Sequence, residues 1–156
     1  MKPSFEEWLE EWSIIRANCD KDAMHDALLE AGQSIPSTEN FDPYSTLDRL
    51  MKHLGRLDQF LSIELPLSAR RKKELLELRK DVDEKLSNQE RIRLRARTRS
   101  LKSQFVDLTN LKDVDEAIVV WQKRLDTAKM QLIPGLIEDF KLTIQVLSEL
   151  RDALDK

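Results

Sequence analysis

The chain has 156 residues and a net charge of -3; 40% of its residues are hydrophobic, 35% are charged and only three are glycine. This composition excludes an all-β fold rich in tight turns, and no apolar run approaches the roughly 20 residues that cross a bilayer. Because the first residues show no signal-peptide pattern and a single cysteine excludes an internal disulfide bond, we expect a cytoplasmic protein without a membrane partner.

The charge is unevenly distributed along the chain. Residues 1–66 carry 6 Lys/Arg and 13 Asp/Glu, residues 67–112 carry 14 and 7, and residues 113–156 carry 6 and 9. A basic middle between acidic flanks can either meet a polyanion or fold back onto the flanks. We favour folding back, because a folded chain brings its own opposite charges together without a cost of association.

The first 31 residues are expected to form a short helical hairpin. Apolar residues recur three and four positions apart on one helical stripe, namely Phe5, Trp8, Trp12, Ile15 and Cys19. Ser4 and Glu7 have the spacing of a capping box at the start of this helix. A second short helix is predicted from Asp20 to about Ala31, with Met24, Ala27, Leu28 and Ala31 inward, and Gly32 would end it.

Residues 32–44 are polar, contain Pro36 and are predicted to form a loop, after which Asp42 and Pro43 would begin the next helix. Leucines then follow a regular three-four spacing, at Leu47, Leu50, Leu54, Leu57 and Leu61. This spacing is typical of a helix in a bundle and equally of a homodimer seam.

A long helix is predicted after Pro66, with Ser68 as its cap. Its apolar stripe, Leu75, Leu78, Val82 and Leu86, resumes in a different phase at Leu94, Leu101, Phe105 and Leu108. The helix therefore either contains a stutter or breaks near Ser87 and Asn88, and we favour a continuous helix.

Two further helices are predicted in the last 45 residues. Asp113 and Glu116 have capping-box spacing ahead of a stripe at Val114, Ile118, Trp121, Leu125, Ala128 and Leu132. Pro134 and Gly135 would turn the chain into a last helix, whose stripe is Ile137, Phe140, Ile144, Leu147 and Leu154.

These elements predict an all-α fold, a helical bundle of about four long helices plus a short N-terminal helical hairpin. We expect a single helical domain over residues 1–156, with a further division into the hairpin 1–31, the loop 32–44 and the main bundle 45–156. No fixed-period repeat and no low-complexity segment is present.

The most unusual segment is residues 91–102, in which five arginines occupy every second position. Alternation is typical of a strand, but the helical context on both sides favours a helix, which would place Arg91, Arg95, Arg99 and Lys102 on one face. Arg70, Arg71, Lys72 and Lys73 could extend this face. Such a face could bind a nucleic-acid backbone, contact an acidic protein partner, or be a solvated helix face whose arginines pair with acidic residues of neighbouring helices. We favour the solvated or internally paired face.

The first helix also offers aromatic residues that could anchor a protein interface. Phe5, Trp8 and Trp12 lie on one helical face among glutamates, and Trp is enriched among interface residues that carry binding energy. We favour the alternative that this aromatic face packs on the core.

No catalytic or metal site is predicted. Asp22 and His25 have the spacing of a helical ligand pair, but a di-metal bundle site needs a second such pair, and Leu50 stands three residues before His53. Nucleotide-binding and nucleophile-elbow motifs are missing, so we predict no cofactor. We therefore expect a non-enzymatic helical protein-interaction module, such as an adaptor, chaperone, inhibitor or assembly subunit, with another protein or a second copy as partner. The alternative is a nucleic-acid-binding protein that uses residues 91–102.

Overall fold

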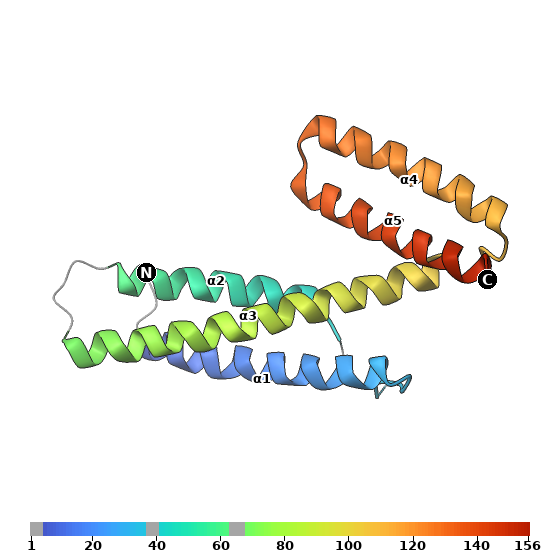
Figure 1. Ribbon diagram of the computed structural model, residues 1–156. Helices are drawn as coiled ribbons and strands as arrows, with labels where there is room; N and C mark the ends of the chain where they lie inside the picture. The colour runs from blue at the N-terminus through green and yellow to red at the C-terminus, as the bar shows by residue number, and fades with distance from the viewer. Residues whose placement is uncertain (1–4, 37–40, 63–67) are drawn as a thin grey trace. The chain divides into compact units, whose positions relative to one another are not determined.

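The computed structural model describes residues 5–36, 41–62 and 68–156, and it is all-α within these ranges (Figure 1). Its five helices are α1 (Phe5–Glu30), α2 (Pro43–Leu61), α3 (Ala69–Gln104), α4 (Leu111–Gln131) and α5 (Pro134–Leu154). The all-α helical bundle that the sequence predicts is thus confirmed. None of the described helices combines the length and the apolar character that crossing a membrane requires.

The N-terminal segment is one continuous helix of 26 residues, where the sequence led us to expect two short ones. The buried stripe of α1 keeps its spacing to the end, but after Cys19 it continues with Asp22 and Asp26 instead of apolar residues. Asp20, the expected start of the second helix, lies inside α1, and its carboxylate accepts a hydrogen bond from Lys85 Nζ at 2.7 Å. Met24, which we expected to point inward, is 56% exposed.

The other helix boundaries follow local capping. Asp42 caps α2, since its Oδ1 accepts a hydrogen bond from the Ser45 amide at 3.1 Å. Pro43 lies in the first turn of the helix, as predicted. α4 begins earlier than predicted, because Asn110 rather than Asp113 provides the cap, with its Oδ1 accepting from the Asp113 amide at 2.9 Å. The Ser4 capping box and Pro66 lie outside the described residues.

Helix α3 runs without a break through Ser87 and Asn88, which confirms the continuous helix. The phase slip in its apolar stripe coincides with Gln89, which is fully buried and continues the seven-residue spacing of Leu75 and Val82. A polar side chain therefore occupies a core position of this helix, and a pattern of apolar residues alone could not predict that this position is buried.

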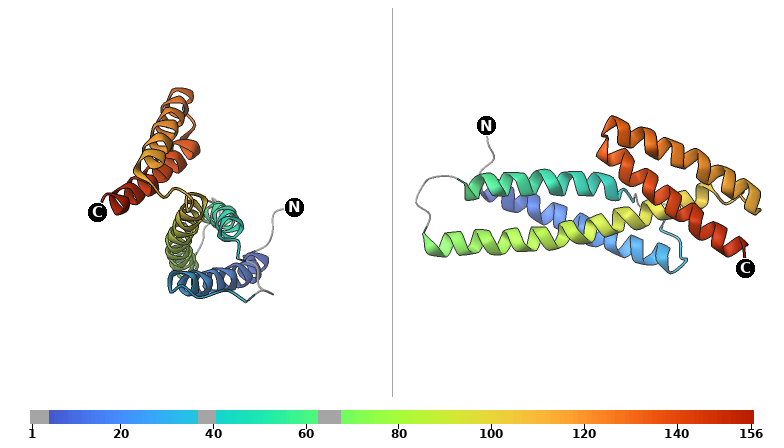
Figure 2. Two further views of the ribbon diagram at one scale, coloured as in Figure 1. Left: turned by 90° about the vertical axis from the view of Figure 1, so that its right-hand side faces the viewer. Right: turned by 45° about the horizontal axis from the view of Figure 1, so that its top comes forward.

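The structure divides into two compact units, Met1–Ala96 and Arg97–Lys156. In unit 1, helices α1, α2 and the first part of α3 run up, down and up around one core (Figures 1 and 2). Its fully buried apolar side chains include Trp8, Leu50, Leu57 and Val82. The single domain that the sequence suggests stays a prediction.

Unit 2 consists of the last turns of α3 and the antiparallel pair of α4 and α5. Leu101 of α3 and Phe105, the residue directly after this helix, pack against Val146 and Leu147 of α5, with Trp121 of α4 among the surrounding partly buried residues. The ring of Phe105 meets Trp121 edge to face at 6.4 Å.

Ion pairs connect the basic α3 to acidic residues of the other helices. In unit 1, Arg79 pairs with Asp58 of α2 and Lys85 with Asp20 of α1, each at 2.7 Å. Such surface pairs contribute only about 0–1 kcal/mol each. In unit 1, the basic middle of the sequence thus does fold back onto acidic residues of the N-terminal flank, with a small contribution to stability.

Candidate interaction surfaces

The arginine-rich segment is helical, and its cations have different surroundings. Arg95 donates to Asp26 Oδ2 of α1 from two of its nitrogens, at 2.7 and 2.6 Å. Arg97 forms a two-point pair with Asp139 of α5, at 2.7 and 2.9 Å. Arg91 is exposed, and its guanidinium donates to the side-chain oxygen of Asn88 on its own helix, at 3.4 Å.

The predicted polyanion-binding face is therefore only partly a free surface. Arg91 and Lys102 are exposed, Arg95 is engaged by a buried carboxylate, and Arg99 is half-buried and makes further interactions. Arg91 and Arg95 belong to unit 1, whereas Arg99 and Lys102 belong to unit 2. These positions favour an internal role for the centre of the segment.

The second basic group lies at the start of α3, and its four residues are all exposed: Arg70, Arg71, Lys72 and Lys73. Arg70 and Arg71 both approach Glu74 at 3.5 Å, and the Arg71 guanidinium also lies 4.2 Å from the centre of the Phe5 ring. Because α3 is continuous and rises 1.5 Å per residue, Arg71 and Arg91 are separated by about 30 Å along its axis. The two basic groups do not form one compact patch.

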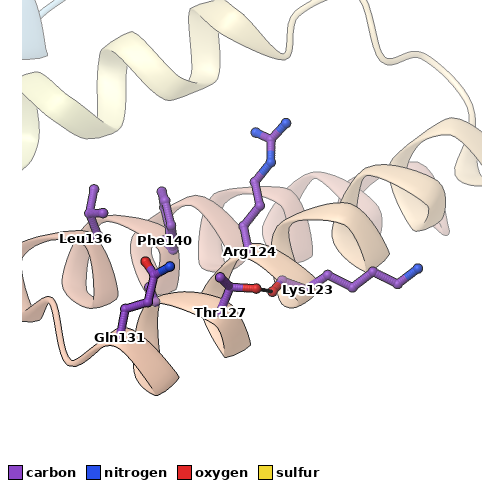
Figure 3. A pocket seen from close by; sticks show the side chains of 7 residues that line it. Lys123, Arg124, Thr127, Gln131, Leu136 and Phe140 are labelled. Carbon is purple, nitrogen blue, oxygen red and sulfur yellow. Dashed lines mark hydrogen bonds between the residues drawn. The ribbon is translucent and has the colours of Figure 1, made fainter.

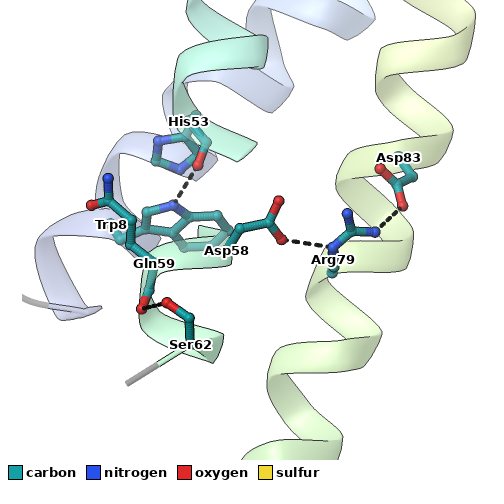
Figure 4. Close-up of polar contacts among 7 residues, drawn as sticks. All are labelled: Trp8, His53, Asp58, Gln59, Ser62, Arg79 and Asp83. Atoms are coloured by element: carbon teal, nitrogen blue, oxygen red, sulfur yellow. Dashed lines mark hydrogen bonds and ion pairs between the residues drawn. The ribbon is translucent and has the colours of Figure 1, made fainter. Parts of the chain in front are cut away.

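The aromatic residues of α1 face the core of unit 1. Trp8 is fully buried and Trp12 is 5% exposed, while Phe5 packs against the same core. Figure 4 shows the Trp8 indole donating its Nε1 hydrogen to the backbone carbonyl of His53, at 3.1 Å. A role for these rings as interface anchors stays a prediction, and it would require α1 to leave this core.

His53 is a fully buried histidine in α2. Its ring stacks on Trp8 at 4.2 Å and on Trp12 at 6.1 Å, and neither ring nitrogen has a hydrogen-bond partner. The nearest carboxylate oxygen, Glu11 Oε2, is 3.9 Å from Nδ1. Burial lowers the pKa of His53 below its usual 6.5, Glu11 opposes this change, and Arg56 and Arg49 add to it.

This environment predicts that acid destabilises unit 1. Since the unfolded chain binds a proton at His53 near pH 6.5 and the folded chain only at lower pH, the free energy of unfolding should fall as the pH drops below about 6.5. The slope from one such group is at most about 1.4 kcal/mol per pH unit. Urea unfolding between pH 5 and 7.5 should show it, and His53→Phe, which keeps a flat ring between the tryptophans, should reduce the slope. Equal slopes in both proteins would contradict this.

A polar layer crosses the core of unit 1 between α1 and α3. Gln89 Nε2 donates to Asp22 Oδ2 at 2.9 Å and to the Pro43 carbonyl at 3.2 Å. Burial and the charge of Asp22 raise the pKa of the neighbouring Cys19 thiol to about 11, so it is neutral and weakly nucleophilic. Within the described parts of the chain, no group of three or more His, Cys, Asp or Glu side chains is placed to hold a metal ion.

The two most exposed large apolar side chains among the described residues of unit 2, Met130 and Leu132, lie where α4 turns into α5. We call Met130, Leu132, Ile133 and Leu136 the apolar tip; they are 85%, 81%, 38% and 41% exposed. Leu132 caps the end of α4 in the left-handed conformation, with φ 54° and ψ 49°. Glycine or asparagine usually occupies this position, because a side chain there costs roughly 1–2 kcal/mol. Leu132 therefore carries a conformational cost without gaining burial.

The pattern of apolar residues in the sequence did not predict this surface. It assigned Leu132 to the buried stripe of α4, since the residue lies four positions after Ala128, but the helix ends at Gln131 and the left-handed turn directs Leu132 outward. The available signal was the pair Leu132 and Ile133 directly before Pro134 and Gly135, because turns normally carry polar residues.

A hollow of about 350 Å³ lies between α4 and α5 beside the apolar tip. Leu136 belongs to both, and the remaining lining residues are Lys123, Arg124, Thr127, Ala128, Gln131 and Phe140. Figure 3 shows Leu136, Phe140 and Arg124 directed to the same side of the helix pair. The hollow therefore combines apolar side chains with two cations.

Comparisons of the chain with protein-family models, with curated proteins and with solved structures find no match.

Proposed function

We propose that this protein is a non-enzymatic helical protein-interaction module that binds a partner protein through the apolar tip. The observation that carries the proposal is Leu132, which is 81% exposed in a backbone conformation that disfavours leucine. With Met130, Ile133 and Leu136 beside it, the tip is a group of apolar side chains at one end of unit 2. Contiguous exposed apolar patches are typical of sites that contact other proteins.

The alternative of nucleic-acid binding has weaker support. Binding to a nucleic acid requires unpaired cations that neutralise its phosphates and so release its counterions. Arg95 and Arg97 instead form ion pairs with Asp26 and Asp139. The non-enzymatic character and the cytoplasmic location stay expectations drawn from the sequence, as does the choice between a different protein and a second copy as partner.

Replacement of Leu132 by glycine tests the proposal without the risk of misfolding. Glycine relieves the left-handed strain but adds backbone entropy to the unfolded chain, so we expect the protein to be stabilised by about 0–1 kcal/mol. Binding of the partner should nevertheless weaken by about tenfold or more, because an exposed apolar anchor is lost. Thermal unfolding measures the stability, and quantitative affinity purification from lysate, with and without nuclease, measures the binding.

The matched control is Val119→Ala, which removes an exposed apolar group from α4 away from the tip. Protein bands that resist nuclease should co-purify with the wild type and with this control, and they should be depleted with Leu132→Gly. Equal recovery with Leu132→Gly would contradict the proposal. Recovery of material that nuclease removes entirely would favour the nucleic-acid alternative. Light scattering of the purified protein reports whether the partner is a second copy.

A further inference from the structure

Within unit 2, a third helix covers the pair of α4 and α5 along only part of its length. In unit 2, Leu101 of α3 and Phe105 directly after this helix enter the core, and they meet residues of the stretches 108–121 and 142–150. The hollow lies on the stretch from Lys123 to Phe140, and none of its lining residues belongs to that core. This part of the pair therefore presents an open groove of the kind into which helices pack side by side.

The lining of this groove has a distinct chemistry. Its base is apolar, formed by the buried Ala128 together with Leu136 and Phe140. Lys123 and Arg124 line the end nearer the core, and no carboxylate is part of the lining. The Arg124 guanidinium lies 4.5 Å from the centre of the Trp121 ring, a cation–π contact, and the Trp121 ring in turn meets Phe140 at 5.4 Å.

We infer that this groove binds an acidic amphipathic helix of a partner protein, an inference that rests on the proposed function. The apolar residues of such a helix would fill the hollow and contact the apolar tip, and Asp or Glu residues beside them would pair with Lys123 and Arg124. Helix-in-groove binding needs apolar anchors three and four positions apart, and two cations without a carboxylate select acidic flanks over basic ones.

The probe is a displayed library of random peptides of about 16 residues, long enough for four helical turns, selected on the immobilised full-length protein. Selected sequences should be enriched in Asp and Glu, with apolar residues at helical spacing. A selected peptide is then synthesised, and its affinity is measured by fluorescence anisotropy. We expect Lys123→Glu combined with Arg124→Glu to weaken binding at least about tenfold, and Leu136→Ser to weaken it similarly.

The matched control is Lys112→Glu combined with Lys156→Glu, which makes the same change in net charge at exposed positions of unit 2 outside the hollow. This control should bind nearly as well as the wild type, and circular dichroism verifies that all variants are folded. Two outcomes would overturn this inference while the proposed function still holds. In the first, the selected peptides bind through Leu136 but contain no excess of Asp and Glu. In the second, both charge-reversed proteins lose the same affinity for the peptide. If neither Leu132→Gly nor Leu136→Ser weakens the binding of any selected peptide, both the inferred groove and the proposed function are overturned.

Discussion

Replacement of Trp8 by alanine should lower the free energy of unfolding of unit 1 by about 3–5 kcal/mol, the range for a large aromatic side chain removed from a core. Trp8 is fully buried and stacks on His53 at 4.2 Å, with Phe5 and Trp12 on either side at 6.0 and 6.1 Å. The change leaves a cavity among these rings and removes the hydrogen bond to the His53 carbonyl. Urea unfolding followed by circular dichroism measures the loss.

The control for this prediction is Leu9→Ala, the neighbouring residue on α1, which is 38% exposed. It should cost less than about 1 kcal/mol, because a partly exposed side chain leaves little cavity behind. Similar losses at positions 8 and 9 would mean that α1 does not pack as described. They would also support the alternative that Trp8 and Trp12 anchor an interface with another chain.

Replacement of Arg95 by glutamine should cost about 2 kcal/mol. Asp26 is 3% exposed, and removal of the cation that pairs with it leaves a carboxylate in the core. Breaking a fully buried pair costs about 3–5 kcal/mol, and we expect less here because the Arg95 side chain is 45% exposed. Urea unfolding at neutral pH gives the value.

Arg91→Gln is the matched control, since it removes an arginine one turn away whose contacts are exposed. Its effect on stability should stay within about 0.5 kcal/mol. The same pair of variants separates structure from binding when oligonucleotide affinity is measured by fluorescence anisotropy at low ionic strength. If Arg91→Gln lowers that affinity while the protein remains stable, the nucleic-acid alternative gains support. Equal destabilisation by both variants would contradict the internal role of Arg95.

The sequence was sufficient to predict the fold class and most of the helices, because their signals are local. Asp42 and Pro43 begin α2 as expected, and the leucine spacing of this helix places Leu50 and Leu57 in the core. These features depend on capping and on a period of 3.6 residues, which are properties of short segments.

The polar layer could not be predicted in the same way. Asp22 and Gln89 are 67 positions apart, and the hydrogen bond between their buried side chains forms only in the folded chain. A stripe that changes from apolar to polar residues looks like the end of a helix, and this is why α1 was divided into two. The error therefore reflects tertiary pairing that a single sequence does not display.

The apolar tip was missed for a different reason. Leu132 fits the period of the α4 stripe, and only the left-handed turn directly after Gln131 reverses its direction. Which residue ends a helix is the least reliable part of any pattern analysis. The hollow beside the tip depends on how α4 and α5 pack together, and no short segment contains that information.

The division of the chain at Ala96 also affects the order in which its parts fold during synthesis. Ribosomes add about 5–20 residues per second, so residues 97–156 take roughly 3–12 s to synthesise. Helical bundles with contacts between neighbouring segments fold in microseconds to milliseconds. We therefore expect α1, α2 and the first part of α3 to have buried Trp8 and His53 before the apolar tip is made. The tip, which is the part most able to associate wrongly, would then emerge next to a unit whose own apolar core is already closed.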